Sequence, residues 1–127
     1  MRVNDLKPRS PVTVERGENL RAASKRLADD EVGALLVFTA SGAVGVFSER
    51  DLTRAVADGG NLDEEPVEQY MTEAPLTVGK DSAVGEAIAK MNEYGVRHLA
   101  VVENGDVVGM ISIRDIVALL GVAWPEL

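Results

Sequence analysis

The chain of 127 residues contains no cysteine, which excludes disulfides, iron–sulfur clusters and thiolate zinc sites. Its one histidine, His98, has no accompanying cluster of acidic residues at metal-ligand spacing, so we expect no metal site. No apolar run approaches the roughly 20 residues of a membrane-spanning helix, and the N-terminus lacks the apolar segment of a secretory signal. These absences favour a globular protein of the cytoplasm that does not enter a membrane.

Positive charge is also scarce, because 13 lysines and arginines face 21 acidic residues and the formal net charge is −8. A nucleic-acid binder usually carries a basic surplus that replaces counterions along the phosphate backbone. We therefore expect no nucleic-acid partner, although a local group of arginines could still hold a small anion. We also expect no enzymatic activity, because a single histidine cannot serve as the base for two equivalent candidate serines.

The sequence repeats itself with an offset of 64 residues. Residues 3–57 align with 67–121 without a gap, and the clearest match pairs GVFSERD at 45–51 with GMISIRD at 109–115. The stretch 58–66 between the copies is polar, opens on glycines and ends on proline, which is typical of an exposed linker. We therefore place the repeats at 1–60 and 61–127, packed together as one module with pseudo-twofold symmetry.

Each repeat has the pattern of a β-α-β-β-α unit, which places the chain in the α/β (α+β) class. Val84, Ala87, Ile88 and Met91 follow a helical period and predict an inward-facing stripe, with Asp81 or Ser82 as the cap and Gly95 as the stop. The other expected elements are strands at 11–14, 35–38, 43–47, 75–78, 99–102 and 107–111, the last two joined by a hairpin turn at Asn104-Gly105, and final helices whose inward residues are Leu52, Ala55, Val56, Ile116, Leu119 and Leu120.

The repeated serine, arginine and aspartate allow two interpretations. The residues are Ser48, Arg50 and Asp51 in the first copy and Ser112, Arg114 and Asp115 in the second. Ser-x-x-Asp at the start of a helix is a capping box, but capping does not account for an arginine in the first turn, which opposes the helix dipole. Alternatively, the serine and arginine bind a phosphate and the aspartate accepts hydrogen bonds from ribose hydroxyls. The two roles are compatible.

Gly45 and Gly109 interrupt apolar strands at equivalent positions of the two copies. A glycine inside a strand indicates a bulge or the close approach of another group to the backbone. We expect one of these at each glycine.

The paired β-α-β-β-α repeat with these two motifs resembles the cystathionine-β-synthase-type (CBS) domain, of which two in tandem form a Bateman module. The resemblance runs from Val3 to Gly121. It implies regulatory binding of an adenosine-containing ligand (AMP, ADP, ATP, S-adenosylmethionine or NAD) in clefts between the repeats, and homodimers of modules. It also implies roles for single residues: ribose contacts for Asp51 and Asp115, hydroxyl contacts for Ser48 and Ser112, first-strand contacts for Thr13 and Thr77, and phosphate contacts for the pair Arg97 and His98.

The two copies are not equivalent, because Gly33-Ala34 stands in the first where Arg97-His98 stands in the second. We expect the cleft that receives Arg97 and His98 to suit a phosphate-bearing ligand better. The expected function is a stand-alone regulatory protein without a cofactor, which binds an adenine nucleotide and passes a conformational change to a client protein. The alternatives are a ligand-free interaction module that acts by dimerisation, and a sensor of S-adenosylmethionine or NAD(H).

Overall fold

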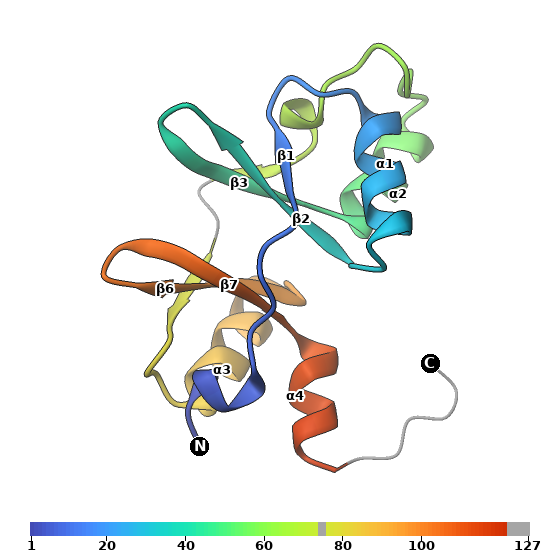
Figure 1. Ribbon diagram of the computed structural model, residues 1–127. Coiled ribbons are helices and arrows are strands. Elements are labelled where there is room, and N and C mark those ends of the chain that lie inside the picture. The colour runs from blue at the N-terminus through green and yellow to red at the C-terminus, as the bar shows by residue number, and fades with distance from the viewer. Residues whose placement is uncertain (74–75, 122–127) are drawn as a thin grey trace. The chain divides into compact units, whose positions relative to one another are not determined.

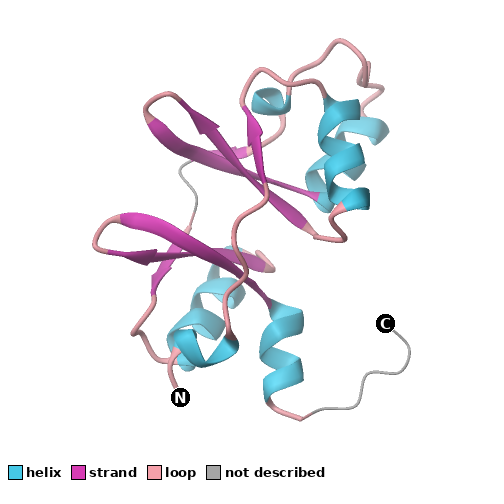
Figure 2. Cartoon of the chain, in the orientation of Figure 1, coloured by secondary structure: helices cyan, strands magenta, loops and turns pink. Residues whose placement is uncertain are grey.

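The computed structural model describes residues 1–73 and 76–121 and divides the chain into two compact units (Figures 1 and 2). The first-repeat unit is Pro11–Pro75, and the second-repeat unit joins Met1–Ser10 to Leu76–Leu127. These compact units differ from the boundaries 1–60 and 61–127 that the repeat suggests. Pro75, at which one expected strand begins, lies outside the described residues.

The first-repeat unit is a four-stranded sheet in the order β1-β2-β3-β4, covered by two helices. Strands β1 and β2 are parallel, and the remaining neighbours are antiparallel. Figure 1 shows α1 and α2 side by side against this sheet. The elements are β1 (Thr13–Glu15), α1 (Leu20–Asp29), β2 (Ala34–Thr39), β3 (Gly42–Ser48), α2 (Glu49–Ala57), the 3₁₀ helix η2 (Val67–Gln69) and β4 (Thr72–Glu73).

The second-repeat unit is built in the same way around a three-stranded sheet in the order β5-β6-β7. Asn104 and Gly105 have φ angles of 51° and 83° in the β6–β7 hairpin, as a primed turn requires, and Gly95 ends α3 at φ 65°. The elements are the 3₁₀ helix η1 (Val3–Leu6), β5 (Thr77–Gly79), α3 (Val84–Tyr94), β6 (His98–Glu103), β7 (Asp106–Ser112) and α4 (Ile113–Leu119). Both units thus confirm the expected element order and the α/β class.

The opening segment of each repeat packs into the core of the other unit. Val3 is fully buried with Val84, Leu99 and Ile111 of the second-repeat unit, whereas Val67 is fully buried in the core of the first-repeat unit. Apolar burial of this kind is the main favourable term in folding. The exchange of these segments explains why the compact units do not follow the sequence repeat.

The exchanged segment also caps α3, which corrects the expected cap at Asp81 or Ser82. The N-cap is Ala83, which offers no side-chain hydrogen bond. Instead, the Val84 amide donates to the carbonyl oxygen of Met1 at 2.9 Å. The first free N–H of the helix is therefore satisfied by backbone from the start of the chain.

The inward-facing stripes of the helices are narrower than the periodicity predicts. Ala87 and Met91 of α3 are buried, but Ile88 is 40% exposed. Val56 of α2 and Leu120, which lies one residue beyond the last residue of α4, are also exposed, contrary to prediction. A helix presents about a third of its surface to one sheet, so positions at the edge of the stripe reach solvent.

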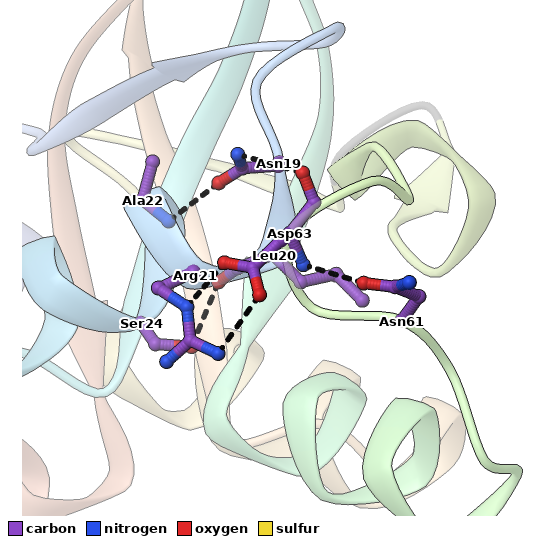
Figure 3. Close-up of polar contacts among 7 residues, drawn as sticks. All are labelled: Asn19, Leu20, Arg21, Ala22, Ser24, Asn61 and Asp63. Atoms are coloured by element: carbon purple, nitrogen blue, oxygen red, sulfur yellow. Dashed lines mark hydrogen bonds and ion pairs between the residues drawn. The ribbon is translucent and has the colours of Figure 1, made fainter.

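The segment between the repeats contains no buried residue, in agreement with the expected exposed linker, and it is also anchored to the start of α1. The Leu20 amide donates to the Glu65 carbonyl at 3.0 Å and the Arg21 amide to the Leu62 carbonyl at 2.9 Å. Figure 3 shows the Arg21 guanidinium paired with the Asp63 carboxylate, and this hydrogen bond lowers the pKa of Asp63. The amides of the first turn of α1 are thus used within the protein.

The ion pair between Glu18 and Arg26 predicts a specific pH dependence of stability. The guanidinium donates to both carboxylate oxygens at 2.6 and 2.7 Å, which lowers the pKa of Glu18 below its ordinary value of 4.5. A lowered folded-state pKa gives stability that is present above the unfolded pKa and is lost as the pH falls through the folded one. We expect Glu18→Gln to cost about 0.5 kcal/mol at pH 7 and almost nothing at pH 3, measured by urea unfolding at both pH values. A difference that stays constant with pH would contradict the role of this pair.

Candidate functional site

In the first copy, the motif forms a capping box at the start of α2. Ser48 is the N-cap, and its backbone N–H and hydroxyl donate to Oδ2 of Asp51 at 2.8 and 3.0 Å. Nη1 of Arg54 donates to the other carboxylate oxygen, Oδ1, at 3.3 Å. Asp51 is only 3% exposed, so this carboxylate is buried and both of its oxygens have partners.

In the second copy, the same capping box leaves one carboxylate oxygen available. The backbone N–H and hydroxyl of Ser112 donate to Oδ2 of Asp115 at 2.8 and 3.2 Å. Ala118 stands where the first copy has Arg54, and within residues 1–73 and 76–121 nothing donates to Oδ1 of Asp115. Asp115 is also half-buried, not buried. The capping interpretation is thus confirmed in both copies, with a difference that the motif alone does not reveal.

The basic residues gather around the motif of the second copy. The Ile113 amide donates to the Arg97 carbonyl at 2.9 Å, and His98 lies opposite Ser112 in the β6–β7 ladder. The side chains of Arg97 and Arg114 are exposed, and that of His98 is half-buried. The fold therefore places Arg97, His98 and Arg114 next to the capping box of Ser112.

The first copy has only Arg50 at the corresponding place in its fold. Arg50 is exposed at the second position of α2. The Gly33 carbonyl accepts a hydrogen bond from the Glu49 amide at 3.0 Å, and Ala34 lies opposite Ser48 in the β2–β3 ladder. Glycine and alanine replace the arginine and histidine of the second copy, whereas Arg54 stands where the second copy has Ala118, so the positive charge is placed differently around the two motifs.

The two first-strand threonines are each held by a basic side chain that sequence reasoning missed. Nη1 of Arg26 donates to the Thr13 carbonyl at 3.0 Å, and Nζ of Lys90 donates to the Thr77 carbonyl at 2.5 Å. Thr13 is exposed and Thr77 half-buried. Arg26 and Lys90 occupy equivalent positions of the repeat, which is the signal that could have identified them.

Gly45 and Gly109 have a structural explanation that involves no ligand. The strand register shifts beside each of them, which confirms the expected bulges. A Cβ at Gly45 would lie 2.6 Å from the Thr72 carbonyl oxygen, and one at Gly109 would lie 2.7 Å from Cβ of Pro8. The group that approaches each glycine thus belongs to another segment of this chain.

A shallow depression of about 470 Å³ lies on α3 and the start of α4, lined among others by Ile88, Asn92, Val96, Arg97 and Ile113. Neither Ser112 nor Asp115 lines it, but Arg97 and Ile113, which adjoin the capping box of Ser112, do. The described residues contain no group of three or more His, Cys, Asp or Glu side chains that could hold a metal. None of the helices in the described part of the chain is long and apolar enough to cross a membrane.

Two α/β units, each with a strand-to-helix junction of the Ser-x-Arg-Asp type, define a tandem-repeat protein with paired candidate ligand motifs. The family model of the CBS domain matches residues 3–58 and 67–122. The chain therefore belongs to the CBS domain family, and it contains two CBS domains in tandem.

Known proteins of the family resemble the chain closely. It is 38% identical over 104 residues to the Arabidopsis thaliana CBS domain-containing protein CBSCBSPB5, and it spans about a fifth of the length of that relative (80% of this chain, 19% of the plant protein). Among solved structures, the chain is similar to the CBS domain protein PAE2072 from Pyrobaculum aerophilum, which was solved in complex with AMP. The sequences are 35% identical, the TM-score is 0.83, and the match covers 91% of this chain and 89% of that one.

A third similar protein was solved with different ligands. The CBS domain pair of protein MJ0100, in complex with 5′-methylthioadenosine and S-adenosyl-L-methionine, is 26% identical with a TM-score of 0.86. The match covers 95% of this chain and all of that one. The two neighbours were thus solved with adenosine-containing molecules.

Proposed function

We propose that this protein is a regulatory CBS pair that binds an adenine nucleotide, with AMP as the first candidate. The supporting observation is the second-copy motif, where Ser112, Arg114 and Asp115 stand next to Arg97 and His98. A guanidinium forms strong charge-assisted bonds with phosphate, and a carboxylate oxygen accepts hydrogen bonds from ribose hydroxyls. The AMP complex of the similar protein PAE2072 supports the same ligand class.

Regulation would follow from unequal affinity of the ligand for different conformations of the protein. A ligand can shift a conformational equilibrium only by as much as its affinity differs between the states. A second copy of the chain or a client protein would respond to that shift. The exposed apolar residues Ile88 and Ile113 on α3 and α4 make this face our candidate for the contact between two copies.

S-adenosylmethionine is the second candidate ligand, because the similar CBS pair of MJ0100 was solved with it. It contains the same ribose but carries a sulfonium cation in place of a phosphate. The cationic group of Arg97 and Arg114, which adjoin Ser112 in the fold, therefore favours AMP over S-adenosylmethionine.

A thermal-shift series with AMP, ATP, S-adenosylmethionine and NADH tests the proposal. A ligand present at 100 times its Kd adds about 2.7 kcal/mol to the free energy of unfolding, and we expect this from AMP. The absence of a shift with every compound would refute nucleotide sensing and favour an interaction module that works without ligand.

Adenosine, which lacks the phosphate, provides the control for the cationic group. We expect Arg97→Ala to weaken AMP binding roughly tenfold by calorimetry, because one charge-assisted bond is lost. The affinity for adenosine should stay within a factor of two. Equal losses for AMP and adenosine would show that Arg97 does not contact the phosphate.

A further inference from the structure

The two aspartates have the same motif around them but different availability for a ligand. A carboxylate offers about four acceptor positions. Asp51 uses two on Oδ2 for the Ser48 cap and one on Oδ1 for Arg54, and it is 3% exposed. Asp115 makes the same cap but is half-buried, and Oδ1 has no donor among the described residues.

The occupied Oδ1 of Asp51 depends on one residue, which lies three positions after the aspartate. Arg54 follows Asp51 by one helical turn, so the two side chains lie on the same face of α2, and the ion pair is formed. The equivalent residue after Asp115 is Ala118, which is exposed and carries no donor on its side chain. Substitution at this single position therefore decides whether the second carboxylate oxygen is occupied.

We infer that Arg54 masks Asp51, so that only Asp115 accepts a ribose and each chain binds one nucleotide. This inference rests on the proposed function for its ligand but not for the masking itself. Asp51 then has a structural role as a cap, and Arg54 is the residue that sets the number of ligands.

The masking can be tested without any ligand by labelling carboxylates with a water-soluble carbodiimide and glycine ethyl ester, followed by peptide mass spectrometry. Asp115 should react several times faster than Asp51 in the native protein. Arg54→Ala should accelerate labelling of Asp51, and Ala118→Arg should slow labelling of Asp115. Equal rates for the two aspartates in the native protein, or rates that neither substitution changes, would overturn the inference.

Calorimetry with AMP tests the consequence for binding, and matched Asp→Asn substitutions supply the control. The amide keeps an oxygen for the serine cap and loses the second acceptor. We expect one AMP per native chain, a roughly 10- to 100-fold weaker Kd in Asp115→Asn, and a change below twofold in Asp51→Asn. Two equal sites, or equal losses in the two variants, would overturn the assignment to Asp115.

Reciprocal substitution at the masking position distinguishes masking from simple charge attraction. An added arginine near the motif would strengthen AMP binding if only net charge mattered. Masking instead predicts a roughly two- to fivefold weaker Kd in Ala118→Arg, which corresponds to one partly exposed ion pair, and a second, weaker AMP in Arg54→Ala. Tighter binding in Ala118→Arg would overturn the inference. If the native protein bound no AMP, the proposed function would fail, and the labelling rates would still decide the masking.

Discussion

Arg2→Cys combined with Ala83→Cys is expected to form a disulfide spontaneously and to raise the free energy of unfolding by roughly 4 kcal/mol. The two residues are an antiparallel bridge pair, flanked by hydrogen bonds from Val3 to Ser82 at 2.8 Å and from Val84 to Met1 at 2.9 Å. Such a pair, not directly hydrogen-bonded, has Cα atoms about 4.5 Å apart, within the range that a disulfide spans.

The large effect comes from the length of the loop that the bond closes. Positions 2 and 83 enclose about 80 residues, and the entropy that a crosslink removes from the unfolded chain grows with loop length. Both native side chains are exposed, so their removal disturbs no core. The chain has no native cysteine, so no other thiol competes. Guanidinium unfolding with and without a reductant measures the gain.

The repeat provides a matched control for this disulfide. Asn19 is the equivalent of Ala83 in the first copy, and it would lie beside Arg2 if the opening segment packed on its own repeat. The structure instead pairs Asn19 with Pro66. Arg2→Cys combined with Asn19→Cys should therefore remain reduced. Crosslinking of this control at the rate of the first pair would contradict the exchange of opening segments.

The order of helices and strands within each repeat could be predicted from the sequence alone. The offset of 64 residues, the helical period in α3 and the turn at Asn104-Gly105 all correspond to elements of the structure. These features are local, because a hydrophobic period or a turn dipeptide depends on neighbours in the chain. The capping boxes at Ser48 and Ser112 were predictable for the same reason.

The pairing between distant segments could not be predicted in this way. Val3 and Val67 align with each other in the repeat, but alignment does not show which core each one enters. The cap of α3 by Met1 and the anchoring of Leu62 and Glu65 at α1 are long-range backbone bonds that leave no residue pattern.

The same difference between local patterns and contacts further along the chain applies to the candidate site. The motif residues were recognisable, whereas the occupied carboxylate of Asp51 depends on Arg54, one turn further along α2. An arginine three residues after an aspartate on a helix is a common surface pair, so this spacing alone does not indicate that the aspartate is masked. The comparison of two equivalent positions within one chain, Arg54 and Ala118, makes it informative.

Gly45→Ala and Gly109→Ala are each expected to destabilise the protein by about 2 kcal/mol, since overpacking of a tight contact costs roughly 1–3 kcal/mol. At Gly45 the new methyl group would lie 2.6 Å from the Thr72 carbonyl oxygen, which is backbone and held in β4. At Gly109 the contacts are Pro8 at 2.7 Å and the Arg9 carbonyl at 3.2 Å, and Arg9 is fixed by two hydrogen bonds to Met110.

Gly85→Ala is the matched control, because the same chemical change should have the opposite sign there. Gly85 lies on the exposed side of α3, where an added methyl group would meet no neighbouring atom within 4 Å. Alanine is a better helix former than glycine by roughly 0.8–1 kcal/mol in a helix interior, and we expect a smaller gain of the same sign at this second residue of the helix. Thermal unfolding of the three variants should therefore show two decreases and one increase in Tm. An unchanged Tm in both Gly45→Ala and Gly109→Ala would mean that the chain at Thr72 and Pro8 can move away from the new methyl group. These glycines would then not be required for the packing of those segments.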